Sequence, residues 1–340
     1  MLTSDEVVQS RAAPPNWLGI VSKYHTPDVR IGLWQIAITL VPYILLWVLM
    51  YWSLNFSYWL TLFLSLPTAL FMVRVFVIMH DCGHGAFFKS VKLNNNFGMI
   101  FGVLTWTPYY SWRHGHAIHH KNSGDLDDRR DIGVVKLFTV KEYQALAWWQ
   151  KLSYRIYRNP AFMFLFGAPF NFLILNRFPY PTDFKRDRIS VHLTTLALVG
   201  YVVGMITLVG WQTYLLLQLP VFFLATVMGV WLFYVQHQFV DTYWRLHPEW
   251  DFMTASLQGS SFYNLPRWLH WFTANIGFHH IHHLSSRIPY YRLQEAYREN
   301  ELFRRSPSLT LLESLRTLDL GLWDEDLGQM VSFSTAVVKR

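Results

Sequence analysis

Four long apolar segments alternate with polar stretches along the chain. They cover residues 31–52, 57–79, 191–211 and 214–235. Each segment has 21 to 23 residues, and a helix of that length, rising about 1.5 Å per residue, crosses the roughly 30 Å hydrocarbon core of a bilayer. The pattern therefore predicts an all-α integral membrane protein with four transmembrane helices.

The four predicted helices form two pairs, because only residues 53–56 and 212–213 separate the members of each pair. Connections this short are the turns of helical hairpins, so the outer ends of both hairpins lie on one side of the membrane. Of the 29 Lys and Arg residues, only Arg74 falls inside a predicted span, and neither turn contains one. Positive charge accumulates in cytoplasmic loops, so we expect both termini to be cytoplasmic.

This topology divides the chain into two parts. Residues 1–30 form a cytoplasmic N-terminal segment, and residues 31–340 form one membrane domain. Within that domain, residues 80–190 and 236–340 make up a predicted cytoplasmic helical cap. The expected location is the cell membrane, which the chain crosses several times.

Two shorter apolar stretches and one arginine need an interpretation of their own. Residues 98–111 and 161–176 are short for a bilayer crossing, and we expect them to be helices that lie in the headgroup region. Arg74 precedes His80 by about 9 Å along a helix. We expect its guanidinium to reach the membrane interface or a lipid phosphate, in a structural role.

The composition excludes several classes of protein and of metal site. Hydrophobic residues make up 52% of the chain and charged residues only 15%, which excludes a disordered chain. Cys82 is the sole cysteine, so there is no cysteine cluster for zinc or for an iron–sulfur centre, and we interpret Cys82 as a packing residue. The net charge of +7 is explained by membrane orientation. No nucleic-acid partner is expected, because no basic patch is interleaved with base-stacking motifs.

Histidine is abundant, with 15 residues, and most of these are clustered. His80 and His84 stand four positions apart where the second predicted span ends. Two later clusters repeat the spacing i, i+3, i+4, which places three rings on one helical face. They are His116, His119 and His120, and His279, His282 and His283. His237 follows the fourth span as His80 follows the second, so it is a ninth candidate.

The nine histidines predict two metal ions in a shared site just beneath the membrane surface, because a single ion takes only about four to six ligands. Imidazole binds zinc, copper, nickel and iron, so the ligand type alone does not choose the metal. The His-Glu-x-x-His pattern of zinc hydrolases is absent, and many neutral ligands suit two Fe2+ ions that activate O2. His114 and His280 lie off the shared faces, where a supporting or stacking role is about as expected as ligation.

Polar side chains near the clusters are candidates for accepting the second ring N–H of a ligating histidine and fixing its orientation. The best placed are Asp81, Asp125 and Asp241, together with Asn275 and Gln236. The alternative for each of them is a place in a solvated loop.

The histidine boxes resemble those of the membrane fatty acid desaturases, and the resemblance extends over nearly the whole chain from about residue 30. Finer similarity comes from residues 154–160 (YRIYRNP), 233–239 (FYVQHQF), 259–263 (GSSFY), 274–280 (ANIGFHH) and 322–326 (LWDED). Together these segments are most similar to bacterial acyl-lipid desaturases of the Bacillus type, which place a cis double bond at Δ5 of phospholipid acyl chains. The Δ12 enzymes share much of the pattern.

The resemblance implies an O2-dependent oxidoreductase that removes two hydrogens from adjacent methylenes, with the nine clustered histidines as its catalytic metal ligands. In the bacterial branch, ferredoxin or flavodoxin supplies the two electrons. No His-Pro-Gly-Gly haem signature and no nucleotide fingerprint occurs, so the donor is expected to be a separate protein. An apolar tunnel from the bilayer into the cap would hold the acyl chain beside the metal and exclude water.

Two other functions stay open from the sequence. A di-iron membrane hydroxylase or ketolase of a hydrocarbon or carotenoid would share the boxes, and product analysis would separate it because desaturation adds no oxygen. A metal transporter or sensor would need polar groups within its spans, yet the four spans contain no carboxylate. Acyl-lipid desaturation is therefore the favoured function.

Overall fold

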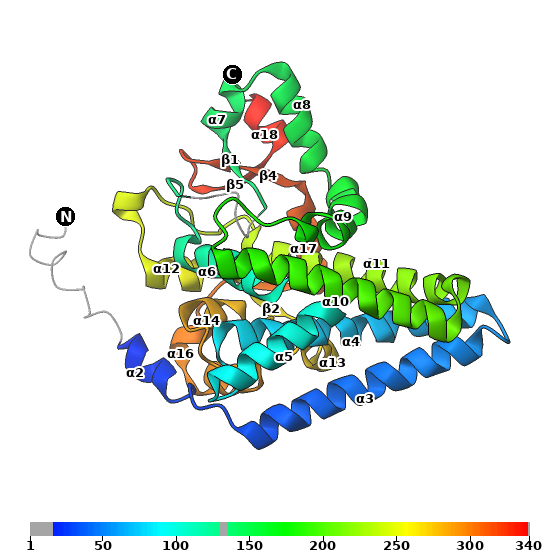
Figure 1. Ribbon diagram of the computed structural model, residues 1–340. Coiled ribbons are helices and arrows are strands. Elements are labelled where there is room, and N and C mark those ends of the chain that lie inside the picture. Colours follow the sequence, from blue (N-terminus) through cyan, green and yellow to red (C-terminus); the bar gives the residue numbers. More distant parts are fainter. Residues whose placement is uncertain (1–15, 129–134, 339–340) are drawn as a thin grey trace, which may run out of the picture.

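The computed structural model describes residues 16–128 and 135–338. The first half of the predicted N-terminal segment, residues 1–15, lies outside the described residues. The described chain is mostly helical, with long helices lying side by side and shorter elements gathered at one end of them (Figure 1). This arrangement confirms the predicted fold class.

Four helices are long and apolar enough to cross a membrane, as predicted. They are α3 (Val29–Ser53), α4 (Tyr58–His84), α10 (Lys185–Val209) and α11 (Trp211–His237). Large apolar side chains such as Trp34 of α3 and Leu196 of α10 are exposed along them. A helix that is apolar even on its exposed side is typical of a membrane span, so the protein is a multi-pass membrane protein.

The ends of these helices differ from the predicted ones. α4 continues beyond residue 79 to His84, and α11 continues beyond residue 235 to His237. Hydropathy marks the part of a helix that lies in lipid, whereas these polar ends are covered by the rest of the protein and stay helical. The turn between α10 and α11 is Gly210, with φ +83°, and not the predicted residues 212–213.

The apolar stretch 98–111 is not the single helix that we expected. α5 (Val91–Leu104) ends within this stretch, and α6 (Tyr109–Asn122) begins after Pro108. A residue that precedes a proline avoids the helical conformation, and Trp106 adopts a left-handed φ of +58°. The break lets α6, with the second histidine cluster, take its own direction.

The remaining elements lie mostly in what we call the cap, the described residues among 85–184 and 238–338. Ahead of α3 stands α2 (Trp17–Ser22). The helices of the cap after α6 are α7 (Val140–Ala145), α8 (Trp148–Tyr157), η1 (Phe162–Gly167), α9 (Ala168–Leu173), η2 (Leu175–Arg177), η3 (His247–Glu249), α12 (Phe252–Gln258), α13 (Arg267–Phe272), α14 (His279–Leu284), α15 (Tyr290–Glu299), α16 (Glu301–Arg304), α17 (Leu311–Ser314), η4 (Leu315–Asp319) and α18 (Phe333–Val338).

The cap also contains two small sheets that the sequence did not lead us to expect. In the first, β1 (Phe138–Thr139) pairs in parallel with β4 (Leu320–Asp324), which pairs antiparallel with β5 (Gln329–Ser332). In the second, β2 (Phe262–Asn264) pairs in parallel with β3 (Ser308–Thr310). Both sheets tie together segments that lie far apart in the sequence.

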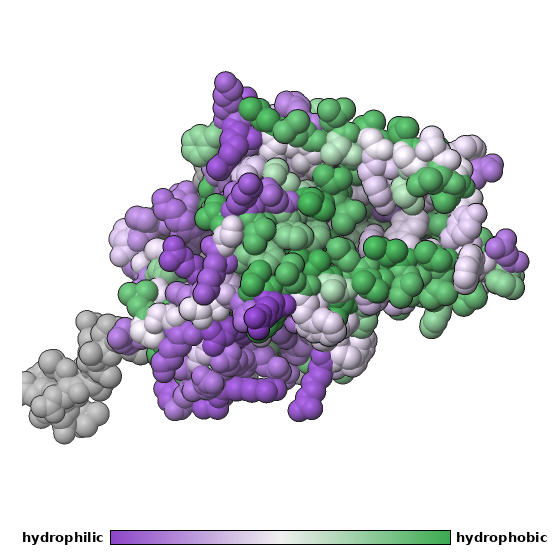
Figure 2. All heavy atoms as spheres, turned by 60° about the horizontal axis from the view of Figure 1, so that its bottom comes forward, coloured by the Kyte–Doolittle hydropathy of each residue, from purple (hydrophilic) through white to green (hydrophobic). Residues whose placement is uncertain are grey.

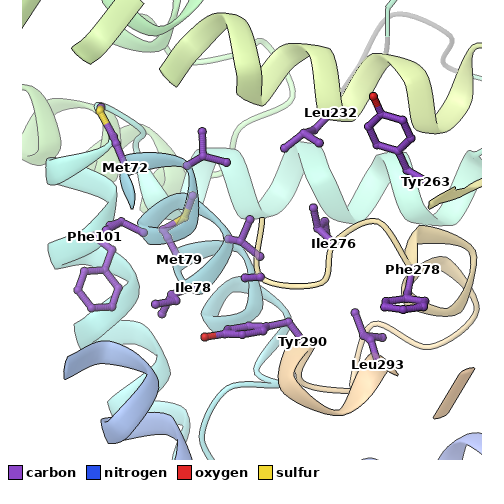
Figure 3. Packing of buried hydrophobic residues seen from close by; sticks show 14 of the residues in the cluster. Met72, Ile78, Met79, Phe101, Leu232, Tyr263, Ile276, Phe278, Tyr290 and Leu293 are labelled. Carbon is purple, nitrogen blue, oxygen red and sulfur yellow. The ribbon is translucent and has the colours of Figure 1, made fainter. Parts of the chain in front are cut away.

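The hydrophobic core collects around α4, which packs against α3, α5 and α11. Figure 3 shows Met72, Ile78 and Met79 of α4 beside Phe101 of α5, in a cluster that also includes Tyr290 of the cap. Figure 2 shows apolar residues over the end of the molecule formed by the long helices and hydrophilic residues over the cap end. The core therefore joins the lipid-facing helices to the cap.

Candidate metal centre

The ends of two long helices supply three of the nine clustered histidines. His80 and His84 lie in the last turns of α4, and His237 is the last residue of α11. α4 stops because Gly85 adopts φ +69° and its N–H bonds to the carbonyl of Cys82, a helix end that favours glycine. Since α4 and α11 pack together, they bring these rings to the same end of the membrane helices.

Two cap helices supply the other six. α6 carries His116, His119 and His120, and α14 carries His279, His282 and His283. α6 docks closely on α4, because a Cβ on Gly83 of α4 would lie only 2.8 Å from the indole of Trp112. Within α6, that indole stacks on the ring of His116, with centroids 4.5 Å apart. A larger residue at position 83 would push the second cluster away.

The nine rings form two groups, and within each group the candidate ligand nitrogens all lie within 4.8 Å of one another. The first group is His80, His84, His116, His120 and His282, and the second is His119, His237, His279 and His283. The groups adjoin, because the rings of His120 and His283 stack with centroids 4.2 Å apart. The structure thus brings together every histidine that the spacing singled out.

The two groups do not follow the sequence clusters. α6 directs His116 and His120 into the first group and His119 into the second. α14 directs His282 into the first group and the other two histidines of its cluster into the second. Each of these helices therefore serves both groups, which couples the geometry of the two.

Within the groups the ring nitrogens converge. The Nε2 atom of His237 lies 3.2 Å from that of His119 and 3.0 Å from that of His279, and the His283 and His279 Nε2 atoms are 3.1 Å apart. Two further Nε2 contacts of 3.1 Å occur in the first group. A neutral imidazole carries one N–H and one lone pair, so rings packed this way bring lone pairs together. A cation bound between them would accept those lone pairs.

Burial keeps the cap histidines of both groups neutral. It lowers their pKa well below the usual value, and neighbouring rings lower it further in all six. These residues are His116, His119, His120, His279, His282 and His283. Neutral imidazole is the form that binds a metal, and five and four such nitrogens match the needs of two divalent ions of the iron, copper or zinc type. The residues present therefore fit a pair of metal ions.

Asp81 reaches a clustered histidine, as the sequence suggested. Its Oδ1 lies 3.2 Å from His80 Nδ1, and its Oδ2 accepts the backbone N–H of Tyr290 at 2.7 Å. Asn275 instead donates from Nδ2 to the Tyr290 carbonyl at 3.2 Å, and Gln236 donates to a backbone carbonyl just ahead of α14. These two amides hold the backbone around the third cluster rather than a ring N–H.

Asp125 and Asp241 lie elsewhere than we expected. The Asp125 carboxylate lies 2.6 Å from the Nδ1 of His247, an exposed ring whose pKa it raises through this hydrogen bond and through its charge. After α6 the chain turns towards Arg245, with which Asp125 forms a β-bridge, and so moves away from the clusters. Asp241 is exposed in the turn that follows α11.

His114 and His280 stand outside both groups. His114 Nδ1 lies 2.8 Å from Asp187 Oδ2, and Ser111 of the same helix donates to Asp183 at 2.7 Å. These contacts fasten α6 to the start of α10. His280 Nε2 donates to a carbonyl of α16 at 2.9 Å. The His114 contact could not be predicted from local spacing, because 73 residues separate the partners.

Arg74 does not extend to the membrane interface, and that expectation is wrong. Its side chain is buried, with 2% of the residue exposed, because partners from other elements meet it inside the protein. It donates to Thr39 Oγ1 at 2.9 Å, to Gln35 Oε1 at 2.5 Å and to the carbonyl of Trp271. Arg74 thus links α4 to α3 and to the end of α13.

A small cavity adjoins the second group beside His237. Phe233, Tyr234 and Gln238 are among the residues that line it, and its volume of about 10 Å³ has room for about one water molecule. The ring of Phe233 lies 5.2 Å from that of His119 and 5.4 Å from that of His237, between centroids.

The family model of the fatty acid desaturases matches residues 57–309, a range that contains all nine clustered histidines. The chain belongs to the fatty acid desaturase family. This desaturase is accordingly an oxidoreductase, as the histidine clusters predicted. Family membership implies an iron pair and O2, and the two histidine groups fit such a pair.

Named relatives agree with this assignment. The desaturase is 44% identical over 313 residues to a fatty acid desaturase of Bacillus subtilis, covering 92% of this chain and 89% of the relative. It is 30% identical over 230 residues to an sn-1 acyl-lipid omega-3 desaturase (ferredoxin) of Synechocystis, covering 65% and 62%. It is 26% identical over 265 residues to an sn-1 oleoyl-lipid 12-desaturase of Anabaena variabilis, covering 73% and 71%.

Proposed function

We propose that this desaturase introduces a cis double bond into the acyl chains of membrane phospholipids. The observation that carries the proposal is the convergence of nine histidine nitrogens, seven of them from buried residues, at the cap end of α4 and α11. Helices long enough to cross a membrane carry three of these histidines, which supports a substrate that lies in the bilayer. Relatives named as acyl-lipid and oleoyl-lipid desaturases support a lipid-linked substrate.

We assign the first histidine group to one iron ion and the second group to the other. The iron pair would supply the oxidising power that an unactivated C–H bond requires. The chain's own residues bind and orient: neutral rings offer lone pairs, Asp81 holds His80, and burial excludes water from the site. Phe233 and Tyr234 line the approach beside His237, where they would position two adjacent methylenes.

The overall reaction takes two hydrogens from the acyl chain. With two electrons and two protons from outside, one O2 is reduced to two water molecules. Ferredoxin or flavodoxin is the proposed donor, and the Synechocystis relative, whose name includes ferredoxin, supports this choice. The donor would dock on the side of the membrane where the cap lies, which we take to be the cytoplasmic side of the cell membrane because the Lys and Arg residues gather there.

The proposed position of the double bond is Δ5, with Δ12 as the next choice. The Δ5 assignment relies on the resemblance to Bacillus-type enzymes, carried by segments such as 154–160 and 233–239. The similarity to an oleoyl-lipid 12-desaturase supports the second choice.

Expression in a bacterium that lacks desaturases tests the proposal. Phospholipids of the cells are analysed by mass spectrometry that locates double bonds, with His120→Ala as an inactive control. Cis-Δ5 chains in the cells with the unaltered protein, and none with the control, are the expected result. Oxygenated chains without new double bonds would instead assign a hydroxylase, and unchanged lipids despite two irons per purified chain would overturn the proposal.

A further inference from the structure

An open pocket of about 630 Å³ lies between the end of α8 and the C-terminal elements of the cap. Its lining includes Arg155, Arg158 and Asn159 on one side, and Asp319, Leu320 and Phe333 on the other. The proposed reaction at the histidine groups makes no use of this pocket.

Arg158 contributes unpaired hydrogen-bond donors to the lining of the pocket. It is buried, with 4% exposed. Its Nη2 donates to Gln238 Oε1 at 2.9 Å and to the Leu320 carbonyl at 2.7 Å, whereas its Nε and Nη1 have no hydrogen-bond partner in the part of the chain that the structure describes. A guanidinium is always charged, and leaving its N–H groups buried and unpaired is unfavourable. An anion in the pocket would accept a hydrogen bond from one of them.

The surrounding charges also favour an anion. Arg155 lines the same pocket, and its Nε donates to the hydroxyl of Tyr143 at 2.7 Å. Asp319 is the acidic residue of the lining, so two cations face one carboxylate. Hydrogen bonds from a guanidinium to phosphate oxygens are charge-assisted and strong, which suits a phosphate ester.

The pocket lies where a lipid headgroup would be. α8 and η1 expose Trp148, Trp149, Leu152, Ile156 and Phe166, and α8 runs across the direction of the four long helices in Figure 1. A helix with apolar side chains on its exposed side and that direction is typical of a segment lying in the membrane surface. Arg155 and Arg158 would then stand at the depth of the phosphates.

The pocket is also adjacent to the metal centre. Arg158 bonds to Gln238, the neighbour of His237, and its guanidinium lies 5.7 Å from the ring centre of Tyr234. Both Gln238 and Tyr234 line the small cavity beside His237. A lipid held at Arg158 would therefore have its acyl chains close to the histidines.

We propose that this pocket binds the phosphate of the phospholipid whose acyl chain is desaturated, with Arg158 as the main contact and Arg155 as the second. The inference rests on the proposed function and deepens it, because it assigns the lipid-linked form of the substrate to a headgroup site. A phospholipid is favoured over the acidic surface of an electron-donor protein, since apolar, membrane-type side chains flank the pocket.

Lipid binding tests the inference without turnover. The iron-containing protein in detergent is titrated with dipalmitoyl phosphatidylglycerol and with dipalmitoylglycerol, which has the same chains without phosphate, and bound lipid is counted by native mass spectrometry. The expected result is about tenfold tighter binding of the phospholipid. Arg158→Gln should abolish the difference and Arg155→Gln should reduce it, with diacylglycerol binding unchanged. The matched control is Arg305→Gln, because Arg305 is exposed and paired with Glu301, and it should keep the preference.

Equal binding of both lipids by the unaltered protein, or an unchanged preference in both pocket variants, would overturn the inference. The inference would also be overturned if Arg158→Lys and Arg155→Gln both bound the two lipids equally poorly. That result would mean that the substitutions damage the structure and do not remove a phosphate contact. Glycerol phosphate that competes fully with the phospholipid would assign a free-phosphate site instead. A raised KM for the electron donor with unchanged lipid affinity would assign a protein-docking site. Absence of desaturation would refute the proposed function while leaving the binding result to decide this inference.

Discussion

The Nε2 atoms of His237 and His279 lie 3.0 Å apart, although 42 residues separate them in the chain. His237 belongs to no sequence cluster, and the Nε2 of His119 lies 3.2 Å from it on another side. Its Nδ1 lies 3.3 Å from the carbonyl of Gly259, which orients the ring. A single histidine at the end of α11 thus stands at the centre of the second group.

Removing the His237 ring should therefore empty or weaken one iron position. In His237→Ala we expect a membrane-inserted protein whose bound iron falls from about two per chain towards one, with double-bond formation abolished. Iron and desaturation are measured on the same preparation. His247→Ala is the matched control, since His247 is an exposed ring bonded to Asp125 outside both groups. Full iron with near-normal product would remove His237 from the site.

Asp81 should support the first group through His80. In Asp81→Asn the side chain can still accept the Tyr290 N–H, but it loses the charge that favours the His80 N–H. Loss of such a supporting hydrogen bond weakens metal binding by roughly 10- to 100-fold, so iron should pass to a chelator at lower chelator concentration. Asp241→Asn changes an exposed carboxylate and should leave iron retention unchanged. Equal retention in the two variants would contradict the role of Asp81.

The long helices could be predicted from the sequence because lipid imposes a simple rule on apolar length. That rule does not apply where α4 and α11 leave the lipid, so the helical ends at His84 and His237 were not predicted. The small sheets were missed for a similar reason. β1 and β4 have two and five residues, too few for a recognisable pattern, and they form through pairing with each other.

The clustered histidines could be predicted because their spacing on helices is local. Their division into two groups could not, since it depends on how α6 and α14 face each other across the site. The supporting residues were the least predictable. Asp125 is close to the second cluster in sequence, but the chain turns it to His247, whereas Asp81 makes the expected contact because it adjoins His80 on one helix.

The orientation of the protein can be tested by labelling intact cells. Cys82 is buried, so it should not react with the label. Labelling then depends on the cysteine that is introduced at an exposed position. A membrane-impermeant maleimide should label Asn55→Cys, in the turn between α3 and α4, and should not label Asp127→Cys, which lies just after α6. Lysed cells should give label at both sites. The reverse pattern in intact cells would place the cap outside and refute the cytoplasmic orientation.

Arg74 should stabilise the folded protein and take no direct part in the reaction. Lysine lacks the planar guanidinium group with its several N–H donors. The Lys side chain of Arg74→Lys therefore cannot bond to Thr39, Gln35 and the Trp271 carbonyl together. Leaving such buried partners unpaired costs about 2 kcal/mol. We expect a lower melting temperature in detergent with much of the activity kept, and no such change in Arg305→Lys. Complete loss of activity at normal iron content and normal melting temperature would instead indicate a direct role in the reaction.

Acid should destabilise the metal-free protein more than the iron-loaded one. Burial lowers the pKa of the cap histidines of both groups in the folded state, while in the unfolded chain it returns to about 6.5. Below that pH the unfolded chain binds more protons than the folded one, so the free energy of unfolding falls as the pH decreases. Melting temperatures of chelator-treated protein should therefore drop between about pH 7.5 and 5.5. With iron bound, the lone pairs are occupied and the drop should begin at lower pH. Identical pH profiles for the two forms would show that the rings do not hold the metal.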